Sequence, residues 1–220
     1  YVTMNNETDF LSSVSGDAIN PTFVNTTTNF YHASLGGGTA ASANPLLFAV
    51  YPDLQYDSWV TIGLEGPANA ALGEADIATV QSDANPWLNN FEPGFGAPGG
   101  NIAIDDGIGG AWYALNGDAN GVAGSDLRVL AGQFTTAGEL SGHLYVQVFI
   151  EGEGGNEFRD TFFFGADAPV ACCTDAAACN YCEDGTVDDG SCEYSADLYL
   201  GPCAGTDGSI LDCDGECLND

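Results

Sequence analysis

Aspartate side chains gather near the C-terminus of the chain, beside a group of cysteines. Calcium is a hard cation that takes about six to eight oxygen ligands, and proteins often supply them from turns rich in Asp, Asn and Gly. The carboxylates that could supply them here are Asp175, Asp184, Asp188, Asp189, Asp212 and Asp214. The pattern predicts calcium binding in this tail. The alternative is a cross-linked spacer whose acidic side chains face solvent.

A second group of oxygen-bearing side chains lies within the preceding, aromatic-rich part of the chain: Asn116, Asp118, Asn120 and Asp126. The first three, followed directly by Gly121, match the first half of an EF-hand calcium loop. The twelfth position of that loop is Leu127, where an EF-hand needs a bidentate Glu, so a true EF-hand is excluded. A shorter calcium loop and an Asn/Asp-rich turn between two strands both remain open.

The cysteines predict a covalently cross-linked segment. All eight lie after residue 171, at Cys172, Cys173, Cys179, Cys182, Cys192, Cys203, Cys213 and Cys217. An even number of closely spaced cysteines is typical of disulfides formed in an oxidising compartment. The Cys179-x-x-Cys182 spacing resembles half of a zinc knuckle, but no second such pair or neighbouring histidine completes it, so we expect disulfides and no zinc.

Signatures of catalysis are sparse. The chain has two histidines, His32 and His143, neither in a recognisable catalytic context, and it has no G-x-S-x-G or H-E-x-x-H motif. Cysteines held in disulfides cannot act as nucleophiles. A glycosidase needs only two carboxylates, so a secreted hydrolase stays as the least favoured alternative. We expect a protein without enzymatic activity.

Charge excludes several classes of partner. The chain carries 32 acidic residues against two basic ones, Arg128 and Arg159, and it has no lysine. Binding to a phosphate backbone needs several basic side chains, so nucleic acids are excluded, and anionic membranes are excluded by the same repulsion. No apolar stretch approaches the roughly 18 residues of a membrane-spanning helix. In so acidic a chain each arginine is expected to pair with a carboxylate.

The C-terminal motifs carry a family resemblance. The tail reads C-T-D at residues 173–175, A-C-N-Y at 178–181, D-D-G-S-C-E-Y at 188–194 and D-C-D-G-E-C at 212–217. It resembles the Cys/Asp-rich modules of large secreted proteins of marine bacteria, notably Bacteroidetes. That resemblance implies export and calcium binding. Cys182 replaces an Asp of those modules and Cys172 is additional, so the disulfide pairing stays open among roughly 105 connectivities.

Two stabilising strategies divide the chain. All 12 Phe and all 3 Trp precede residue 165, whereas the cysteines follow residue 171. We therefore expect a β domain over residues 1–166 and a small, irregular, disulfide-rich acidic module over residues 167–220. The second segment has too few large apolar side chains to offset its chain entropy without cross-links.

Apolar runs separated by Gly- and Asn/Asp-rich turns predict the strands of the first domain. They cover residues 46–51, 59–64, 77–80, 102–104, 111–115, 127–130, 143–150 and 158–164, with one or two extended strands in residues 1–44 and at most one helical turn near residues 72–77. Strands without intervening helices cannot form parallel crossovers, so the sheets should be antiparallel. The predicted fold is all-β, an antiparallel β-sandwich, with a jelly-roll variant compatible.

These features favour a secreted structural or adhesive protein that self-associates, as a homo-oligomer or as the subunit of a surface filament or sheath. The polar segment 1–44 could add as a strand to a neighbour's sheet edge, and calcium could bridge the acidic surfaces. The chain begins at Tyr1 without an export signal, which we interpret as a mature secreted form. The main alternative is a polysaccharide-binding module that stacks sugars on Trp59, Trp87, Trp112, Tyr113 or Tyr145, although strand aromatics more often pack in a core.

Overall fold

The computed structural model describes residues 1–194. The chain divides into two compact units, Tyr1–Ala168 and Pro169–Asp220, here called the β domain and the C-terminal module. The sequence-based boundary at residue 166 lies two residues from this division. The predicted site residues Asp212, Asp214, Cys203, Cys213 and Cys217 lie outside the described residues. No helix in residues 1–194 is long and apolar enough to cross a lipid bilayer.

The β domain is built from short strands. They are β1 (Val2–Thr3), β2 (Phe10–Gly16), β3 (Thr22–Thr26), β4 (Trp59–Val60), β5 (Ala78–Val80), β6 (Ile102–Ile104), β7 (Gly110–Tyr113), β8 (Arg128–Val129), β9 (Gly132–Gln133), β10 (Leu140–Phe149) and β11 (Glu157–Phe164). Helical segments are single turns or little more: η1 (Ala40–Ser42), η2 (Pro45–Leu47), η3 (Pro52–Tyr56), η4 (Ala70–Leu72), α1 (Trp87–Phe91), η5 (Ala119–Gly121), η6 (Ile150–Gly152) and η7 (Gly165–Asp167). The predicted all-β class is confirmed.

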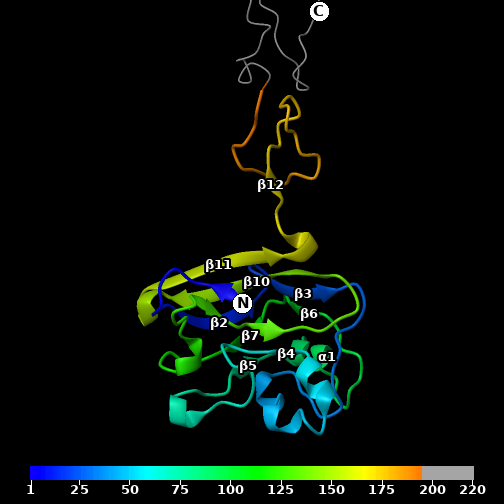
Figure 1. Cartoon of the computed structure of the whole chain (residues 1–220), viewed down its shortest axis with the longest axis vertical. Coiled ribbons are helices and arrows are strands. Elements are labelled where there is room, and N and C mark those ends of the chain that lie inside the picture. Colours follow the sequence, from blue (N-terminus) through cyan, green and yellow to red (C-terminus); the bar gives the residue numbers. More distant parts are fainter. Residues whose placement is uncertain (195–220) are drawn as a thin grey trace, which may run out of the picture. The chain divides into compact units, whose positions relative to one another are not determined.

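One seven-stranded antiparallel sheet dominates the β domain (Figure 1). The long strand β10 pairs with β11 along one edge; along the other edge it pairs first with β3 and then with β2. Strand β6 continues the sheet beyond β3, whereas β7 and β5 continue it beyond β2. Two further antiparallel pairs, β1 with β8 and β4 with β9, lie outside this sheet.

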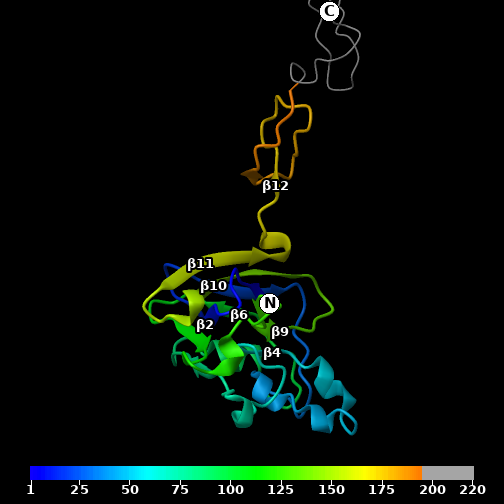
Figure 2. The same ribbon diagram turned by 60° about the vertical axis from the view of Figure 1, so that its left-hand side comes forward.

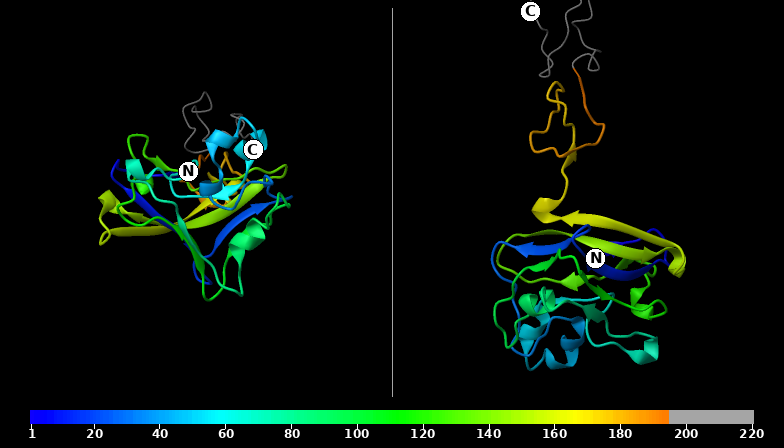
Figure 3. Two further views of the ribbon diagram at one scale, coloured as in Figure 1. Left: turned by 90° about the horizontal axis from the view of Figure 1, so that it is seen from below. Right: turned by 180° about the vertical axis from the view of Figure 1, so that it is seen from behind.

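In two places of the large sheet, a pair of short strands lies end to end where one long strand could lie, and the two breaks are side by side. Strands β2 and β3 follow one another along β10, separated by residues 17–21, and β6 and β7 follow one another along them, separated by residues 105–109. The two interruptions touch, since a Cβ at Gly109 would lie 3.3 Å from the Cβ of Asp17. On the two sides of these breaks the sheet diverges into two parts, here called wings: one is β2-β7-β5 and the other is β3-β6 (Figure 3).

The hydrophobic core fills the space between the wings. Val14 and Trp112 from one wing and Val24, Ile102 and Ile104 from the other are fully buried in one cluster. Trp87 on α1 and Trp112 lie 5.5 Å apart between ring centroids, and both indoles donate to backbone carbonyls. The result is a sandwich-like arrangement in which a single bent sheet supplies both faces.

The prediction of a strand over residues 46–51 is wrong. Asn44 caps η2 by accepting a hydrogen bond from the Leu46 amide, and Pro45 occupies the first position of that turn, where its fixed φ suits a helix. Pro52 then starts η3. The apolar side chains between the two prolines stay largely in solvent, with Leu46 85% and Val50 69% exposed.

The remaining strand predictions differ from the structure mainly in length. The predicted strand 102–104 is β6 itself, and the predictions at 143–150 and 158–164 correspond to β10 and β11. Residues 59–64 form only the two-residue strand β4, although Val60, Ile62 and Leu64 are buried, as are Trp59 and Thr61. The polar N-terminal segment supplies a central strand, β2, and β1 already pairs with β8.

Candidate functional site

Two disulfides hold the described part of the C-terminal module. Cys172 bonds to Cys182 and Cys173 to Cys192, and Cys179 is also oxidised. They bring together β12 (Ala171–Cys172) and β13 (Val187–Asp188), which pair in parallel. Few residues of this segment are buried, so the disulfides take the place of a hydrophobic core, as predicted. They also indicate that the chain folds in an oxidising environment.

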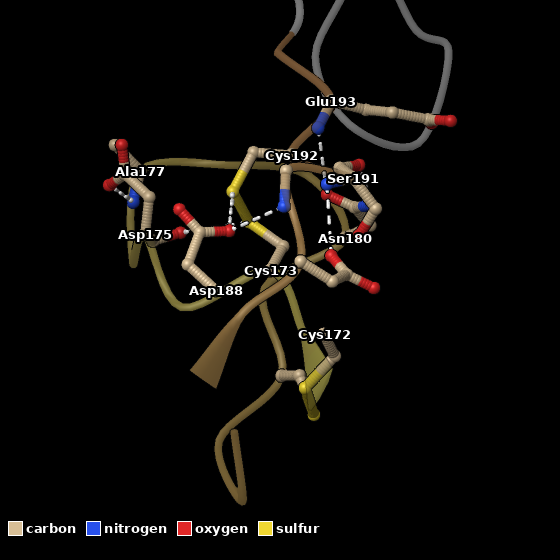
Figure 4. The surroundings of a disulfide bond; sticks show 12 residues. Cys172, Cys173, Asp175, Ala177, Asn180, Asp188, Ser191, Cys192 and Glu193 are labelled. Atoms are coloured by element: carbon tan, nitrogen blue, oxygen red, sulfur yellow. Dashed lines mark hydrogen bonds between the residues drawn. A yellow bond between two sulfur atoms is a disulfide. The ribbon is translucent and has the colours of Figure 1, made fainter. Parts of the chain in front are cut away.

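The predicted calcium ligand Asp175 closes a turn (Figure 4). Its carboxylate accepts hydrogen bonds from the Tyr194 hydroxyl at 2.6 Å and from the Ala177 amide at 2.9 Å. These two bonds, the one from Tyr194 foremost, hold the pKa of Asp175 below its usual range. Asp175 is therefore kept as an anion, but its oxygens already have partners within the module.

Asp188 and Asp189 also accept hydrogen bonds from backbone amides two residues ahead. Asp188 accepts a hydrogen bond from the Gly190 amide at 3.0 Å, and Asp189 accepts one from the Ser191 amide at 2.9 Å. The Ser191 hydroxyl and amide together lower the pKa of Asp189. The Sγ of Cys192 lies 3.8 Å from Asp188, a contact and not a hydrogen bond, because a disulfide sulfur carries no hydrogen.

The carboxylates in residues 169–194 of the module do not converge. No group of three or more His, Cys, Asp or Glu side chains able to hold a metal occurs among the described residues. Asp184 is exposed and lies just after Cys182, outside the Cys172–Cys182 loop. Asn180 instead ties the interior of the larger loop to its C-terminal end, since it donates to the Ser191 carbonyl at 2.7 Å and accepts from the Glu193 amide at 2.8 Å.

The second predicted calcium loop is likewise divided among separate partners. Asn116 donates to the Gly152 carbonyl, and Asp118 accepts from the Leu115 amide. Asn120 is buried and joins two segments, accepting from the Ala75 amide and donating to the Ile62 carbonyl at 2.7 Å. Asp126 pairs with Arg128. These bonds fit a turn that fastens neighbouring loops.

The β domain contains a buried polar pair that the sequence did not reveal. His32 Nδ1 lies 3.4 Å from an oxygen of Asp57, and both side chains are fully buried. Asp57 also accepts hydrogen bonds from the Ala33 and Gly37 amides at 2.9 and 3.0 Å. Only the folded chain brings these residues together; their spacing in the sequence matches no known motif.

The His32–Asp57 pair resembles a catalytic dyad, but both side chains are fully buried and a substrate could not reach them. His32 Nε2 lies 2.8 Å from the Phe91 carbonyl, which can only accept, so this nitrogen is a donor and has no lone pair to offer a nucleophile. The nearby Ser58 hydroxyl donates to the Thr135 carbonyl instead. The pair therefore fastens residues 32–37 to α1 and to the segment after η3.

Both arginines pair with carboxylates, as predicted. Arg128 lies 3.2 Å from Asp126, and Arg159 lies 3.3 Å from Glu157. All four side chains are about half exposed, so these pairs add little stability.

The tryptophans predicted as sugar-stacking candidates are in the core. Trp59, Trp87 and Trp112 are each at most 3% exposed. Trp59 nevertheless lines a cavity of about 560 Å³ together with Phe48, Gln55, Glu65 and Gln133, among others. Its indole Nε1 has no hydrogen-bond partner among the described residues. An apolar wall with amide and carboxylate groups suits a neutral polar ligand.

Strand β11 is the most exposed long element of the β domain. Within the described chain it pairs with β10 alone, so its second edge is free. Phe158 and Phe162 lie opposite Val148 and Leu144 of β10, on the core side of the sheet, yet they are 43% and 44% exposed. Phe163, on the other side, is 48% exposed. Phe164, at the end of the strand, packs against the core, whereas Phe158 and Phe162 stay half-exposed.

Comparison of the chain with protein-family models, with curated proteins and with solved structures finds no match to any of them.

Proposed function

We propose that the protein is a secreted, extracellular structural subunit that self-associates into a filament or sheath. The observation that carries this proposal is the free edge of β11. A strand edge of eight residues with exposed aromatic side chains is a template for pairing with another chain, and monomeric proteins usually blunt or cover such edges. The disulfides of the C-terminal module support an extracellular location.

Charge limits how copies of this subunit can approach. The formal net charge of −30 repels like copies, so close contact requires screening or bridging cations. Calcium bound by exposed carboxylates of facing copies would supply that bridging. Asp184 and Asp188 are exposed on the module, and such a site is completed only when two copies meet.

Negative-stain electron microscopy of the concentrated protein, with millimolar calcium and again with EDTA, tests the proposal. Regular polymers that dissolve in EDTA support a calcium-dependent structural subunit. Polymers that survive EDTA support self-association through strand contacts alone. A protein that stays monomeric at high concentration in both conditions contradicts the proposal.

The cavity beside Trp59 favours a second candidate function, the binding of a neutral carbohydrate. Phe48 offers an aromatic face there, and Gln55 and Gln133 offer amide groups. Calorimetric titration with soluble glycans tests this function, with Phe48→Ala as the variant that should lose binding while keeping its circular dichroism spectrum. Glycans that bind both proteins equally, or neither, rule the cavity out.

A further inference from the structure

A second exposed apolar surface lies on the β domain, in residues 45–52, here called the apolar loop. It exposes Leu46, Leu47, Val50 and Tyr51, and no charged residue occurs from Asn44 to Pro52. The loop is the C-terminal end of a longer stretch without charged residues, which runs from Ala18 to Pro52. An exposed apolar patch of this kind marks an interaction surface.

The backbone of the apolar loop is held only by short-range hydrogen bonds. The Leu47 and Phe48 amides donate to the carbonyls of Asn44 and Pro45, and the Tyr51 amide donates to the Leu47 carbonyl. Turns of this type are weak. The run Leu-Leu-Phe-Ala-Val-Tyr has high β propensity, so an extended conformation paired with another strand is accessible to it.

The apolar loop and β11 lie at opposite ends of the β domain. Figures 1 and 2 both show β11 along the top of the domain and the blue segment that contains η2 and η3 at its base. If two different surfaces at opposite ends of a subunit bind each other, the subunits associate head to tail. Such a contact gives an open filament, or a ring if the rotation between subunits closes.

From these features we infer that the apolar loop of one copy docks along the free edge of β11 of the next copy. The inference rests on the proposed function and names its interface. The free edge offers unpaired backbone groups, and the loop offers a β-prone segment that is not in a sheet. Leu46 and Val50 would cover Phe158 and Phe162, which the chain's own core leaves exposed.

A second copy is the occupant that the charges favour. The loop is uncharged, and β11 carries Arg159, one of the two basic residues in the chain, beside Glu157 and Asp160. The loop adds no charge to such a contact, and Arg159 offsets one of the two acidic residues of β11, so these two surfaces repel each other little. Asp160 already accepts a hydrogen bond from the Thr161 amide at 2.7 Å, so this amide is not bonded to β10 and belongs to the free edge.

The test uses variants of the full chain that block one surface at a time. Leu46→Glu/Val50→Glu blocks the loop. Thr161→Pro blocks the edge without removing a bond to β10, and Phe158→Glu/Phe162→Glu blocks it a second way if the proline disturbs folding. The matched control is Ile19→Glu/Leu72→Glu, since these side chains are 85% and 65% exposed and lie on neither surface.

Sedimentation velocity in calcium is the measurement. We expect loop and edge variants each to weaken association by at least about tenfold, while the control assembles like wild type. A mixture of a loop variant with an edge variant should give dimers that do not grow, because one intact loop meets one intact edge. Such dimers distinguish a head-to-tail contact from a symmetric one.

Two other outcomes separate this inference from the proposed function. If wild type assembles and the loop and edge variants assemble equally well, the interface is wrong and the structural role stands. If wild type does not assemble at all, both fall. Hydrogen exchange adds a direct readout: residues 46–51 and 157–164 should gain protection in wild-type assemblies, and unchanged exchange at both would overturn the inference.

Discussion

At the scale of single residues, the buried Asp57 carboxylate joins the segment after η3 to residues 32–37. It accepts two backbone amides and faces His32. We expect Asp57→Ala to lower the free energy of unfolding by about 2–4 kcal/mol, because the buried Ala33 amide and the Gly37 amide lose their acceptor. Urea denaturation measures this, with the nearby exposed Asp53→Ala as control. A loss no larger than the control's would contradict the structural role of Asp57.

Asp106 predicts a pH dependence. Hydrogen bonds from the Gly109 amide, the Ser82 hydroxyl and the Ile108 amide, that from Gly109 foremost, lower its pKa below the unfolded value. A lowered folded pKa adds stability above the unfolded pKa of about 3.9, and this contribution is lost as the pH falls through the folded pKa.

The variant Asp106→Asn isolates that contribution. The stability difference between wild type and this variant should be constant above about pH 5 and should shrink below about pH 4. Thermal unfolding at a series of pH values measures it, and the adjacent Asp105→Asn is the control. A difference that persists unchanged at pH 2 would show that the hydrogen bonds do not depend on the charge of Asp106.

At the scale of elements, the two described disulfides should differ in importance. Cys173–Cys192 closes a loop with a sequence separation of 19, whereas Cys172–Cys182 closes one of 10. Because a longer closed loop restricts the unfolded chain more, removal of the first should cost more, with about 3 kcal/mol as the scale of either effect.

Hydrogen exchange of two double variants checks this order. In Cys173→Ser/Cys192→Ser, amide protection should disappear throughout residues 169–194, whereas Cys172→Ser/Cys182→Ser should keep protection around Asn180. Both should leave the β domain unchanged, since it contains no cysteine. Equal loss in both variants would contradict the loop-length argument.

The sequence predicted the class of the fold better than the arrangement of its elements. The strand predicted at residues 143–150 corresponds to β10, in which Val146 and Val148 are buried. The apolar run after Pro45 was misread because a run of apolar residues does not reveal whether the sheet has a place for it. Conversely β2, rich in serine, was described only as an extended polar segment, although it is a buried central strand.

The candidate sites were predicted less well, for a physical reason. Carboxylates such as Asp175 and Asp189 can bind a cation or bond to amides two residues ahead, and the sequence patterns for these two roles are the same. Contacts between distant segments were invisible: nothing near Asn120 in the sequence marks it as the partner of Ile62, and nothing links His32 to Asp57.

At the scale of the whole molecule, the charge predicts how assembly responds to ions. Raising sodium chloride from about 0.15 M to 1 M shortens the screening length from roughly 8 Å to 3 Å. If calcium acts only by screening, 1 M sodium chloride should restore assembly in EDTA. If it bridges carboxylates, only calcium at millimolar concentration should do so. Light scattering in the two salts measures the difference, and assembly that ignores both would contradict a role for charge.

The two interruptions at residues 17–21 and 105–109 have a practical consequence. The two loops lie side by side and contact each other, while β2 and β3 remain paired with the same strand, β10. Short peptides inserted at these two sites should emerge as neighbours from an otherwise unchanged scaffold. A pair of fluorophores placed there would give constant energy transfer in the folded β domain, and its loss would report the moment at which the row β2-β3 separates from the row β7-β6.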